Sequence, residues 1–474
     1  MTACNQYSNN SAQGRRTMHY LTARNKSLRD DFLYRSRCMS VGLIVLYWIP
    51  LVHAVEKAEV WKNFRGPGGQ GMARTADIPL RWSEKKNVKW KTRIPGRGFS
   101  APVIDRNQVW LTTAFDVPSN PEEITRRTVN NTGSEPITVS DSATMYAICI
   151  DRNTGKIIRE IELLHVNEPQ WVHVENSYAT PTPVIEGNRL YCHFGTFGTV
   201  CVDTHLGEIV WTNTDHQVMH ENGPASNPIL WNDLLIFHCD GSDEQYIAAI
   251  DKETGDFAWK TPRSGSMHAN PQLKKAYGTP VVMRRNGKTV LLSPAANWLY
   301  AYDPATGEEL WKVSLGKLGF SIVPVPVVDE ENVYVCTGYV SANLVAYGPV
   351  RPDKAPDILW QYRKQVPHKS SPLLVDGRLY FISDRGGVLT CLAADSGEVL
   401  YRKRLSGGYS ASPIALKNHI VFFSDTGKAT VLRPGSEFEL IAENEIAGRI
   451  QASPAVAGDA LYIRTETDLY KIAK

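Results

Sequence analysis

The chain has 474 residues, of which 42% are hydrophobic and 21% are charged, so it can bury a sizeable core. The formal net charge is only +3, and the sequence lacks the concentrated basic stretch that nucleic-acid-binding proteins carry. Twelve tryptophans and 35 glycines suit a fold of many short strands joined by regular turns.

The first 54 residues have the order of a polar leader followed by a secretory signal. Arg29, Arg35 and Arg37 precede an apolar run from Val41 to Val52, and small residues up to Ala54 form a cleavage site. The run is shorter than the about 20 apolar residues of a membrane span. We therefore expect export by a Sec-type signal to the periplasm or another extracytoplasmic compartment, with no stable membrane span after cleavage.

The sequence does not fix the start codon or the conformation of the segment that follows the signal. Met1, Met18 and Met39 all remain possible starts. Residues 55–86 form an N-terminal extension that contains a glycine-rich stretch at 66–71. Because this stretch includes a proline and no Lys-Ser/Thr pair follows it, it is not a phosphate-binding loop. We expect a leader that is flexible or packed across the fold.

From residue 87 onward one strand pattern recurs eight times. Each copy begins with a residue-proline pair and continues through three apolar strands. The pairs begin at Ala101, Thr182, Asn227, Thr279, Val325, Ser371, Ser412 and Ser453. After a first interval of 81 residues the spacing runs from 41 to 52 residues, close to that of propeller blades. The long first interval is explained by an insertion at 117–144, which we expect to be a long loop.

A turn follows the third strand of the repeat and leads to a tryptophan. Asp251 to Gly255 precedes Trp259, and Asp303 to Gly307 precedes Trp311. In such a turn the Asp side chain accepts hydrogen bonds from backbone amides, and the glycine takes a left-handed conformation. We expect the tryptophans to lie on outer strands and to dock one blade on the next. The docking residues are Trp90, Trp211, Trp259, Trp311 and Trp360.

The last repeat has only three strands before the chain ends, whereas an unassigned strand precedes the first repeat at 87–94. If this strand completes the last blade, the ring closes and no blade edge stays open. The sequence thus predicts an all-β fold, an eight-bladed β-propeller over residues 87–474.

The cysteines follow the repeat and do not suggest a disulfide framework. Cys149, Cys201 and Cys391 share a small buried position before the turn, and Cys239 and Cys336 share another. Cys4 and Cys38 belong to the signal region. Cys192 is expected to face Cys201 across a hairpin, where either a disulfide or two thiols, which we favour, would fit.

With these motifs the chain resembles the pyrroloquinoline-quinone-like (PQQ-like) propeller repeats. That fold occurs in quinoprotein alcohol dehydrogenases and in the propeller lipoprotein of outer-membrane-protein assembly. The leader Trp61 to Pro67 ahead of the propeller is similar to that of exported proteins common in planctomycete-like bacteria. The resemblance implies a fold more than an activity, because one fold hosts many sites.

The resemblance also implies what a quinone site would need. Quinoprotein dehydrogenases hold the quinone on the propeller axis with Ca²⁺, acidic and amide ligands, a stacking tryptophan and often two adjacent cysteines. This chain has no adjacent cysteine pair, and no Glu, Asn and Asp set falls at matching repeat positions. PQQ with calcium therefore remains only a minor alternative, and the sequence predicts no cofactor.

Polar side chains gather in the loops that enter the inner strands and join the second and third strands. The ligand-binding candidates are His173, Glu175, Asn176, Tyr178, His193, His220, Glu221, Asn222, His238 and Asp240. Further round the ring come His268, Tyr277, His368, Lys369, Asp384, Arg385, Arg449 and Gln451.

Three interpretations compete for this cluster. Histidine and carboxylate pairs suit a divalent metal, but no close metal-ligand spacing is present. Asp240 to Glu244 is acidic enough for Ca²⁺ yet lacks the EF-hand spacing. The third interpretation, which we favour for any single residue, is that these groups cap strands and satisfy loop amides.

No catalytic set is recognisable: the nucleophile-elbow motif is absent, and spacing assembles no Ser/His/Asp triad. We therefore expect a non-catalytic binding or scaffold protein that takes a protein, peptide or glycan partner on the loop face. The alternative is a quinoprotein-like or metal-dependent oxidoreductase with its site at the propeller axis.

Overall fold

The computed structural model describes residues 60–474 except for 317–318 and 340–341. The predicted signal segment lies outside the described residues. Within them, no helix has both the length and the apolar character needed to cross a membrane.

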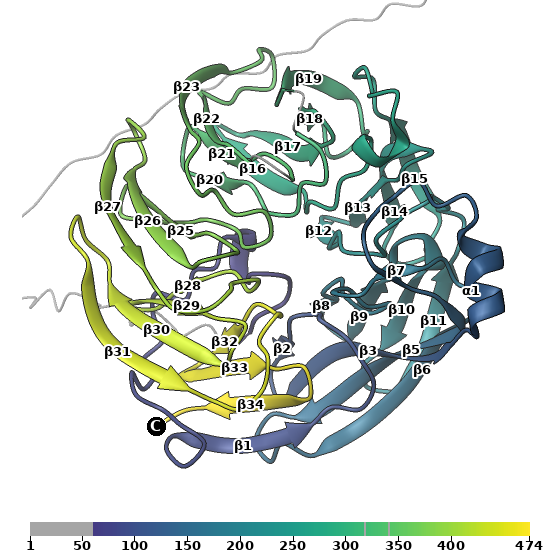
Figure 1. Cartoon of the computed structure of the whole chain (residues 1–474), viewed down its shortest axis with the longest axis horizontal. Helices are drawn as coiled ribbons and strands as arrows, with labels where there is room; N and C mark the ends of the chain where they lie inside the picture. The colour runs from purple at the N-terminus through teal and green to yellow at the C-terminus, as the bar shows by residue number, and fades with distance from the viewer. Residues whose placement is uncertain (1–59, 317–318, 340–341) are drawn as a thin grey trace, which may run out of the picture. The chain divides into compact units, whose positions relative to one another are not determined.

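Eight four-stranded antiparallel sheets surround one axis and form the blades of a β-propeller (Figure 1). Each inner strand begins directly after the proline of a predicted residue-proline pair, as β24 does after Pro372. The predicted eight-bladed PQQ-like architecture is confirmed. The second and third strands of the blades carry nearly continuous buried runs, as β21 and β22 do, because both faces of a blade pack against neighbouring blades.

The strands of blades 1 to 4, from the axis outward, have the following bounds. Blade 1 comprises β2 (Val103–Asp105), β3 (Gln108–Pro118), β5 (Ser140–Asp151) and β6 (Ile157–Asn167). Blade 2 comprises β8 (Val184–Glu186), β9 (Arg189–His193), β10 (Thr199–Asp203) and β11 (Glu208–Asn213). Blade 3 comprises β12 (Ile229–Trp231), β13 (Leu234–Asp240), β14 (Gln245–Asp251) and β15 (Phe257–Pro262). Blade 4 comprises β16 (Val281–Arg285), β17 (Lys288–Ala295), β18 (Trp298–Tyr302) and β19 (Glu309–Ser314).

Blades 5 to 8 follow the same order. Blade 5 comprises β20 (Val327–Val328), β21 (Val333–Cys336), β22 (Leu344–Gly348) and β23 (Asp357–Tyr362). Blade 6 comprises β24 (Leu373–Val375), β25 (Arg378–Ile382), β26 (Val388–Ala393) and β27 (Val399–Arg404). Blade 7 comprises β28 (Ile414–Ala415), β29 (Ile420–Phe423), β30 (Lys428–Arg433) and β31 (Glu439–Glu445). Blade 8 comprises β32 (Ala455–Ala457), β33 (Ala460–Arg464), β34 (Asp468–Ile472) and β1 (Val88–Arg93).

The ring closes as the sequence predicts, because the outer strand of blade 8 comes from the start of the propeller. Strand β1 pairs antiparallel with β34, with Lys91 opposite Tyr470 and Arg93 opposite Asp468. The two strands lie side by side at the outer edge of the ring (Figure 1). Closure therefore joins the N-terminal and C-terminal parts of the propeller in one sheet.

Polar residues before the prolines link neighbouring blades around the axis. The hydroxyl of Ser412 accepts the backbone N–H of Ser371, and the hydroxyl of Ser453 accepts that of Ser412, both at 3.0 Å. The same bond joins Ala101 to Thr182, Thr182 to Asn227, and Val325 to Ser371. The extended backbone that proline imposes on the preceding residue leaves its N–H free for this bond. The Ser/Thr/Asn-Pro pattern is thus a device that holds blades together.

The turn after the third strand receives the tryptophan of the preceding blade. Asp251 accepts the amides of Glu253 and Thr254 at 2.8 and 3.0 Å, and Gly255 has a φ of 81°. A Cβ on this glycine would lie 2.6 Å from the ring of Trp211. The Trp211 indole N–H donates to the carbonyl of Lys252 at 3.0 Å. Equivalent indole bonds join Trp90 to Arg152, Trp259 to Pro304, Trp311 to Arg351, and Trp360 to Ala394.

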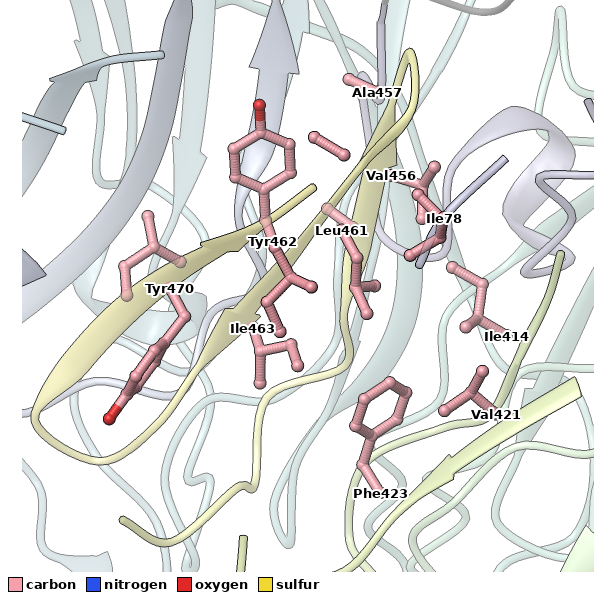
Figure 2. Close-up of a cluster of buried hydrophobic side chains, with 14 of the residues drawn as sticks. Ile78, Ile414, Val421, Phe423, Val456, Ala457, Leu461, Tyr462, Ile463 and Tyr470 are labelled. Atoms are coloured by element: carbon pink, nitrogen blue, oxygen red, sulfur yellow. The ribbon is translucent and has the colours of Figure 1, made fainter. Parts of the chain in front are cut away.

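The leader packs across the ring on the ends of inner strands. Trp61 exchanges backbone hydrogen bonds with Ile104 of blade 1, and Ala73 and Gly71 bond to Ala415 of blade 7. Between these ends lies the short helix η1 (Pro67–Gly69). Figure 2 shows Ile78 of the leader among Ile414 of blade 7 and side chains of blade 8. Residues 60–80 therefore belong to the packed fold, which answers whether this leader is packed or flexible.

The insertion in blade 1 is more ordered than the expected loop. Strands β3 and β5 continue into it as far as Pro118 and from Ser140, and helix α1 (Pro121–Thr128) lies between them. Asn120 caps this helix, because its side chain accepts the amide of Glu123 at 3.0 Å. Strand β4 (Ile137–Thr138) then pairs with β7 (Val172–His173). A proline, two glutamates and this cap favour the helix, a signal that the loop prediction overlooked.

The six described cysteines are free and buried. Cys201 lies opposite Trp211 in the sheet, at the small position that Ala249 and Ala301 hold in other blades. The favoured prediction of two thiols at Cys192 and Cys201 is confirmed, because both are free. The expectation that they face each other across the hairpin is wrong: Cys192 lies opposite Val200, and Cys201 lies opposite Tyr191. The two thiols point to opposite faces of the blade, because the side chains of successive strand residues alternate between its faces.

The remaining short helices are η2 (Gly195–Phe197) and η3 (Pro271–Leu273).

Candidate functional site

A pocket of about 1570 Å³ opens at the axis on the face that carries the loops into the inner strands. All eight blades contribute lining residues, as do loops between second and third strands. Phe64 of the leader also lines the pocket, so the packed leader contributes to its wall. Residues 132–136 of the insertion line it from the side of blade 1. The pocket therefore lies on the face where the sequence predicts a ligand site.

Four of the ten candidate residues line the pocket: His173, Glu175, Asn176 and Asn222. The other six do not line it. Glu221 is half-buried, and the buried ones are Tyr178, His193, His220, His238 and Asp240. Of the residues further round the ring, His268 lies outside the pocket. Those that line it are Tyr277, His368, Lys369, Asp384, Arg385, Arg449 and Gln451.

The buried histidines of blades 2 and 3 form structural contacts. His193 Nδ1 lies 2.8 Å from the hydroxyl of Thr199, which also lies 3.1 Å from Nε2 of His216. His220 Nε2 accepts the backbone N–H of Thr196 at 2.8 Å. Burial lowers the pKa of His216 and of His220 to about 4, so both are neutral near pH 7. These side chains hold loops in place and are not open to a ligand.

Asp240 serves as the buried counter-ion of an arginine. Its two oxygens accept from Nε and Nη2 of Arg263 at 2.9 and 2.8 Å, and both side chains are fully buried. Arg263 Nη1 also donates to Ser293, whose hydroxyl lies 2.8 Å from Nε2 of His238. The carboxylate of Asp240 raises the pKa of Arg263. An Asp engaged in this way by both oxygens is not a calcium ligand.

The charged groups that line the pocket are mostly paired with one another. Arg449 donates to Glu175 and lowers the pKa of that carboxyl group. His173 Nε2 lies 3.7 Å from a carboxylate oxygen of Glu135. His368 Nδ1 lies 3.1 Å from a carboxylate oxygen of Asp384. The positive and negative side chains that line the pocket therefore largely neutralise one another.

Sequence reasoning missed several lining residues. Asp425 occupies the same repeat position as Asp384, so an alignment of the copies would have found it. Burial raises the pKa of Asp425. Lys275 donates to Gln272, and burial lowers its pKa. Tyr339 lines the pocket with 42% of its surface exposed, and no pattern in the sequence marks it.

The lining does not match the residues that a quinone site would need. No tryptophan and no cysteine is among the lining residues of the described structure. Where the structure describes the chain, no three His, Cys, Asp or Glu side chains come close enough to hold a metal ion. The carboxylates of Glu175 and Asp384 already bind Arg449 and His368. We derive no reaction step through a quinone.

A known protein family matches most of the chain. The family model described as outer membrane protein assembly factor BamB matches residues 81–261, 137–383 and 350–472. The chain belongs to this family. Together the BamB-family matches cover nearly the whole propeller. No curated protein matches the chain.

Solved structures show the same fold at low sequence identity. BamB from Moraxella catarrhalis has a TM-score of 0.53 and 13% identity over 82% of this chain and 97% of its own. The computationally designed Ika8 protein has a TM-score of 0.48 and 13% identity over 72% of this chain and 95% of its own. A europium-containing methanol dehydrogenase has a TM-score of 0.46 and 11% identity over 89% and 99%. At these identities the likeness to BamB establishes the fold alone.

Proposed function

We propose that the protein is an exported, non-catalytic binding or scaffold protein whose axial pocket takes a protein, peptide or glycan partner. The observation that carries the proposal is a large pocket built by loops of all eight blades. Several of its charged side chains are paired, as Glu175 is with Arg449. Such a site offers recognition surface, and its side chains do not form a recognisable catalytic set.

Two further observations support this proposal. The matching family is described as an assembly factor, a class that works by holding other proteins. The apolar run that ends near Val52 predicts export, which places the pocket in an extracytoplasmic compartment. For the alternative, an oxidoreductase, the lining of the described structure offers neither a tryptophan nor a cysteine.

Photo-crosslinking in the source cells tests the pocket as the binding site. A photoreactive phenylalanine analogue replaces Tyr339 at the pocket, or Val399 on the outer strand β27 as a control. The two side chains are equally exposed, at 42% and 41%. We expect a specific adduct from position 339 alone. Adducts of equal yield from both positions, or none from position 339, would exclude the pocket as the binding site.

A further inference from the structure

Six basic side chains gather at the end of blade 6 that borders the pocket. They come from the loop that enters β24, the loop between β25 and β26, and the end of β27. We call them the blade 6 patch: Arg363, Lys364, Lys369, Arg385, Arg402 and Arg404. All six are exposed. Lys369 and Arg385 line the pocket, so the patch begins at the rim of the pocket and continues to the outer strand.

Hydrogen bonds join the three segments that carry the patch. Arg402 donates to the side chain of Gln365, in the loop that enters β24. Arg404 Nη1 donates to the carbonyl of Gly386 at 3.0 Å, in the loop between β25 and β26. The two loops also bond to each other, because the amide of Lys369 donates to a carboxylate of the second loop at 3.0 Å. The six bases therefore form one continuous surface.

The patch is positive in a protein that is otherwise slightly acidic. Residues 55–474 contain 45 Lys and Arg against 47 Asp and Glu. In the described part of the chain none of the six bases forms an ion pair. The neighbouring acid, Asp384, accepts the amides of His368 and Lys369 at 2.6 and 3.0 Å and lies beside the His368 ring. The positive charge of the patch is therefore left without a partner.

The repeat offers an internal comparison for this charge. The strand position that Arg402 holds in blade 6 is a lysine in blades 3, 4 and 8, and each lysine has a carboxylate nearby. The pairs are Lys260 with Glu244 at 3.8 Å, Lys312 with Glu309 at 3.0 Å and Lys91 with Glu84 at 3.6 Å. Arg402 bonds to a neutral glutamine instead. Blade 6 thus lacks the acid that neutralises this position elsewhere.

Backbone donors lie beside the patch on the rim of the pocket. Gly386 and Gly407 line the pocket, and both are exposed. Neither backbone N–H has an acceptor among the described residues. Because glycine has no side chain, a carboxylate or a second backbone can approach these N–H groups closely. Together with the six bases they form a surface of donors, which favours a ligand rich in acceptors.

We propose that the blade 6 patch binds an acidic segment of a partner protein, which continues from the patch into the pocket. Four of the six bases are arginines, whose planar guanidinium groups match the two oxygens of a carboxylate. Clusters of arginine are a recurring means of recognising acidic peptide motifs. This inference rests on the proposed function, because it names the partner class of the same pocket.

Two other anionic partners fit the surface less well. A lipid bilayer is flat and would meet all eight blades, yet Lys260, Lys312 and Arg449 of other blades are paired with acids. Single-stranded nucleic acids are bound by several aromatic side chains on which the bases stack. Among the described lining residues only Tyr339 is both aromatic and exposed. An extended acidic peptide needs neither a flat basic face nor a row of aromatic rings.

Calorimetric titration of the full secreted chain with a capped octapeptide of alternating glycine and glutamate tests the inference. The uncharged reference is the same peptide with glutamine in place of glutamate. We expect the glutamate peptide to bind with a Kd of about 1 mM or tighter at low salt, about tenfold more tightly than the glutamine peptide. Raising the salt from about 0.05 M to about 0.5 M should weaken it about tenfold, because ions screen exposed charges.

A double substitution removes two charges from the patch. Lys364→Gln with Arg385→Gln should weaken binding of the glutamate peptide about tenfold, about threefold for each lost charge. Neither side chain donates a hydrogen bond within the described structure, so no internal contact is removed. The matched control is Lys156→Gln with Lys288→Gln, which removes the same charge from exposed positions at the opposite end of blades 1 and 4. The control should bind like the parent.

Each remaining outcome speaks against the acidic segment. The inference is overturned if the two peptides bind equally, if the patch variant binds like the parent, or if the control variant loses as much affinity. It is also overturned if phosphatidylglycerol vesicles or a thymidine octanucleotide bind more tightly than the glutamate peptide. Thermal melting of both variants shows that a loss of binding is not a loss of fold.

The crosslinking experiment separates this inference from the proposed function. If position 339 yields its adduct while the glutamate peptide does not bind, the pocket remains the binding site and only the acidic nature of the partner is refuted. If neither the adduct nor peptide binding is seen, both proposals are refuted.

Discussion

At the residue scale, the indole of Trp311 lies where two blades meet. It is 7% exposed, and its N–H donates to the carbonyl of Arg351 in the next blade at 2.6 Å. The other docking tryptophans make the same bond, so a single repeat position accounts for much of the contact between blades. Blades 1, 6 and 7 depart from this rule. Arg159 takes the tryptophan's place in blade 1 and donates to the carbonyl of Leu206, whereas Tyr401 and Ala442 hold the position in blades 6 and 7.

Truncating this tryptophan should strongly destabilise the fold. We expect Trp311→Ala to lower the free energy of unfolding by about 3–5 kcal/mol, because it removes a large buried ring and leaves a cavity. Trp311→Phe keeps a ring and loses the hydrogen bond, so it should cost about 1 kcal/mol beyond packing. Urea denaturation measures both. Equal stability of the alanine variant and the parent would contradict a docking role.

The glycine that receives a tryptophan should be equally sensitive. Gly307 has a φ of 73°, and a Cβ there would lie 2.5 Å from the ring of Trp259. We expect Gly307→Ala to lower the melting temperature, because the new methyl group both clashes and strains the backbone. Gly287→Ala is a control for strain alone, since Gly287 has a φ of 74° and open space around it. If the two variants have the same melting temperature, the close approach of Trp259 is not what makes Gly307 necessary.

The buried histidines predict a loss of stability in mild acid. The folded-state pKa of His216 and His220 is about 4, whereas an unfolded histidine has a pKa of about 6.5. Between these values the unfolded chain binds the extra protons, so the free energy of unfolding falls as the pH drops. The slope is about 1.4 kcal/mol per pH unit for each group. Urea titrations at pH 7 and pH 5 measure it.

A conservative variant separates this effect from general acid lability. His220→Gln keeps an acceptor for Thr196 but cannot be protonated, so it should lose about 2 kcal/mol less than the parent between pH 7 and pH 5. His205→Gln, which changes an exposed histidine, should behave like the parent. A parent-like loss in His220→Gln would show that this imidazole is not the proton acceptor.

At the element scale, strand β1 decides whether the ring is closed. Its hydrogen bonds to β34 complete blade 8, and the leader before it contacts blades 1, 7 and 8. The insertion is the element that departs most from the repeat. It contributes helix α1 and strand β4, and its tip reaches blade 4, where Gln272 donates to Thr132 at 3.0 Å.

Removing the closing segment should open the propeller. We expect a chain that lacks residues 60–94 to melt at a lower temperature and less cooperatively, because blade 8 then exposes a strand edge. A synthetic segment of residues 60–94 added in trans should restore the transition. Scanning calorimetry measures both states. If the truncated chain melts like the parent, ring closure by β1 contributes nothing to stability.

At the scale of the whole molecule, the same scaffold is compatible with binding and with quinone chemistry, and the lining residues distinguish them. We expect the full chain, secreted in the presence of quinone and Ca²⁺, to show no stoichiometric quinone band in its absorption spectrum. The physical reason is that no tryptophan is among the lining residues of the described structure, and that the carboxylates of Glu175 and Asp384 already bind Arg449 and His368. Metal analysis of the same sample completes the test. A quinone band with one calcium per chain would favour the oxidoreductase.

The sequence alone determined the architecture because the propeller is a repeated local pattern. The Asp-x-x-Thr-Gly turn and the proline at each inner strand are short-range signals that recur every 41 to 52 residues after the first interval, and the strand at 87–94 supplies the one that the last repeat lacks. Their agreement specifies the number of blades and the way the ring closes. The insertion escaped this reasoning because it occurs once and has no second copy with which to compare it.

Only the tertiary structure decided which polar residues reach the pocket. His173 and His220 occupy equivalent loops in the sequence, yet the first lines the pocket and the second is buried beneath it. Asp240 looked available until its partner Arg263, 23 residues later, was seen to bind both oxygens. Side-chain direction and long-range pairing depend on how the eight blades pack around one axis. The repeat pattern describes each blade by itself and does not specify these contacts between blades.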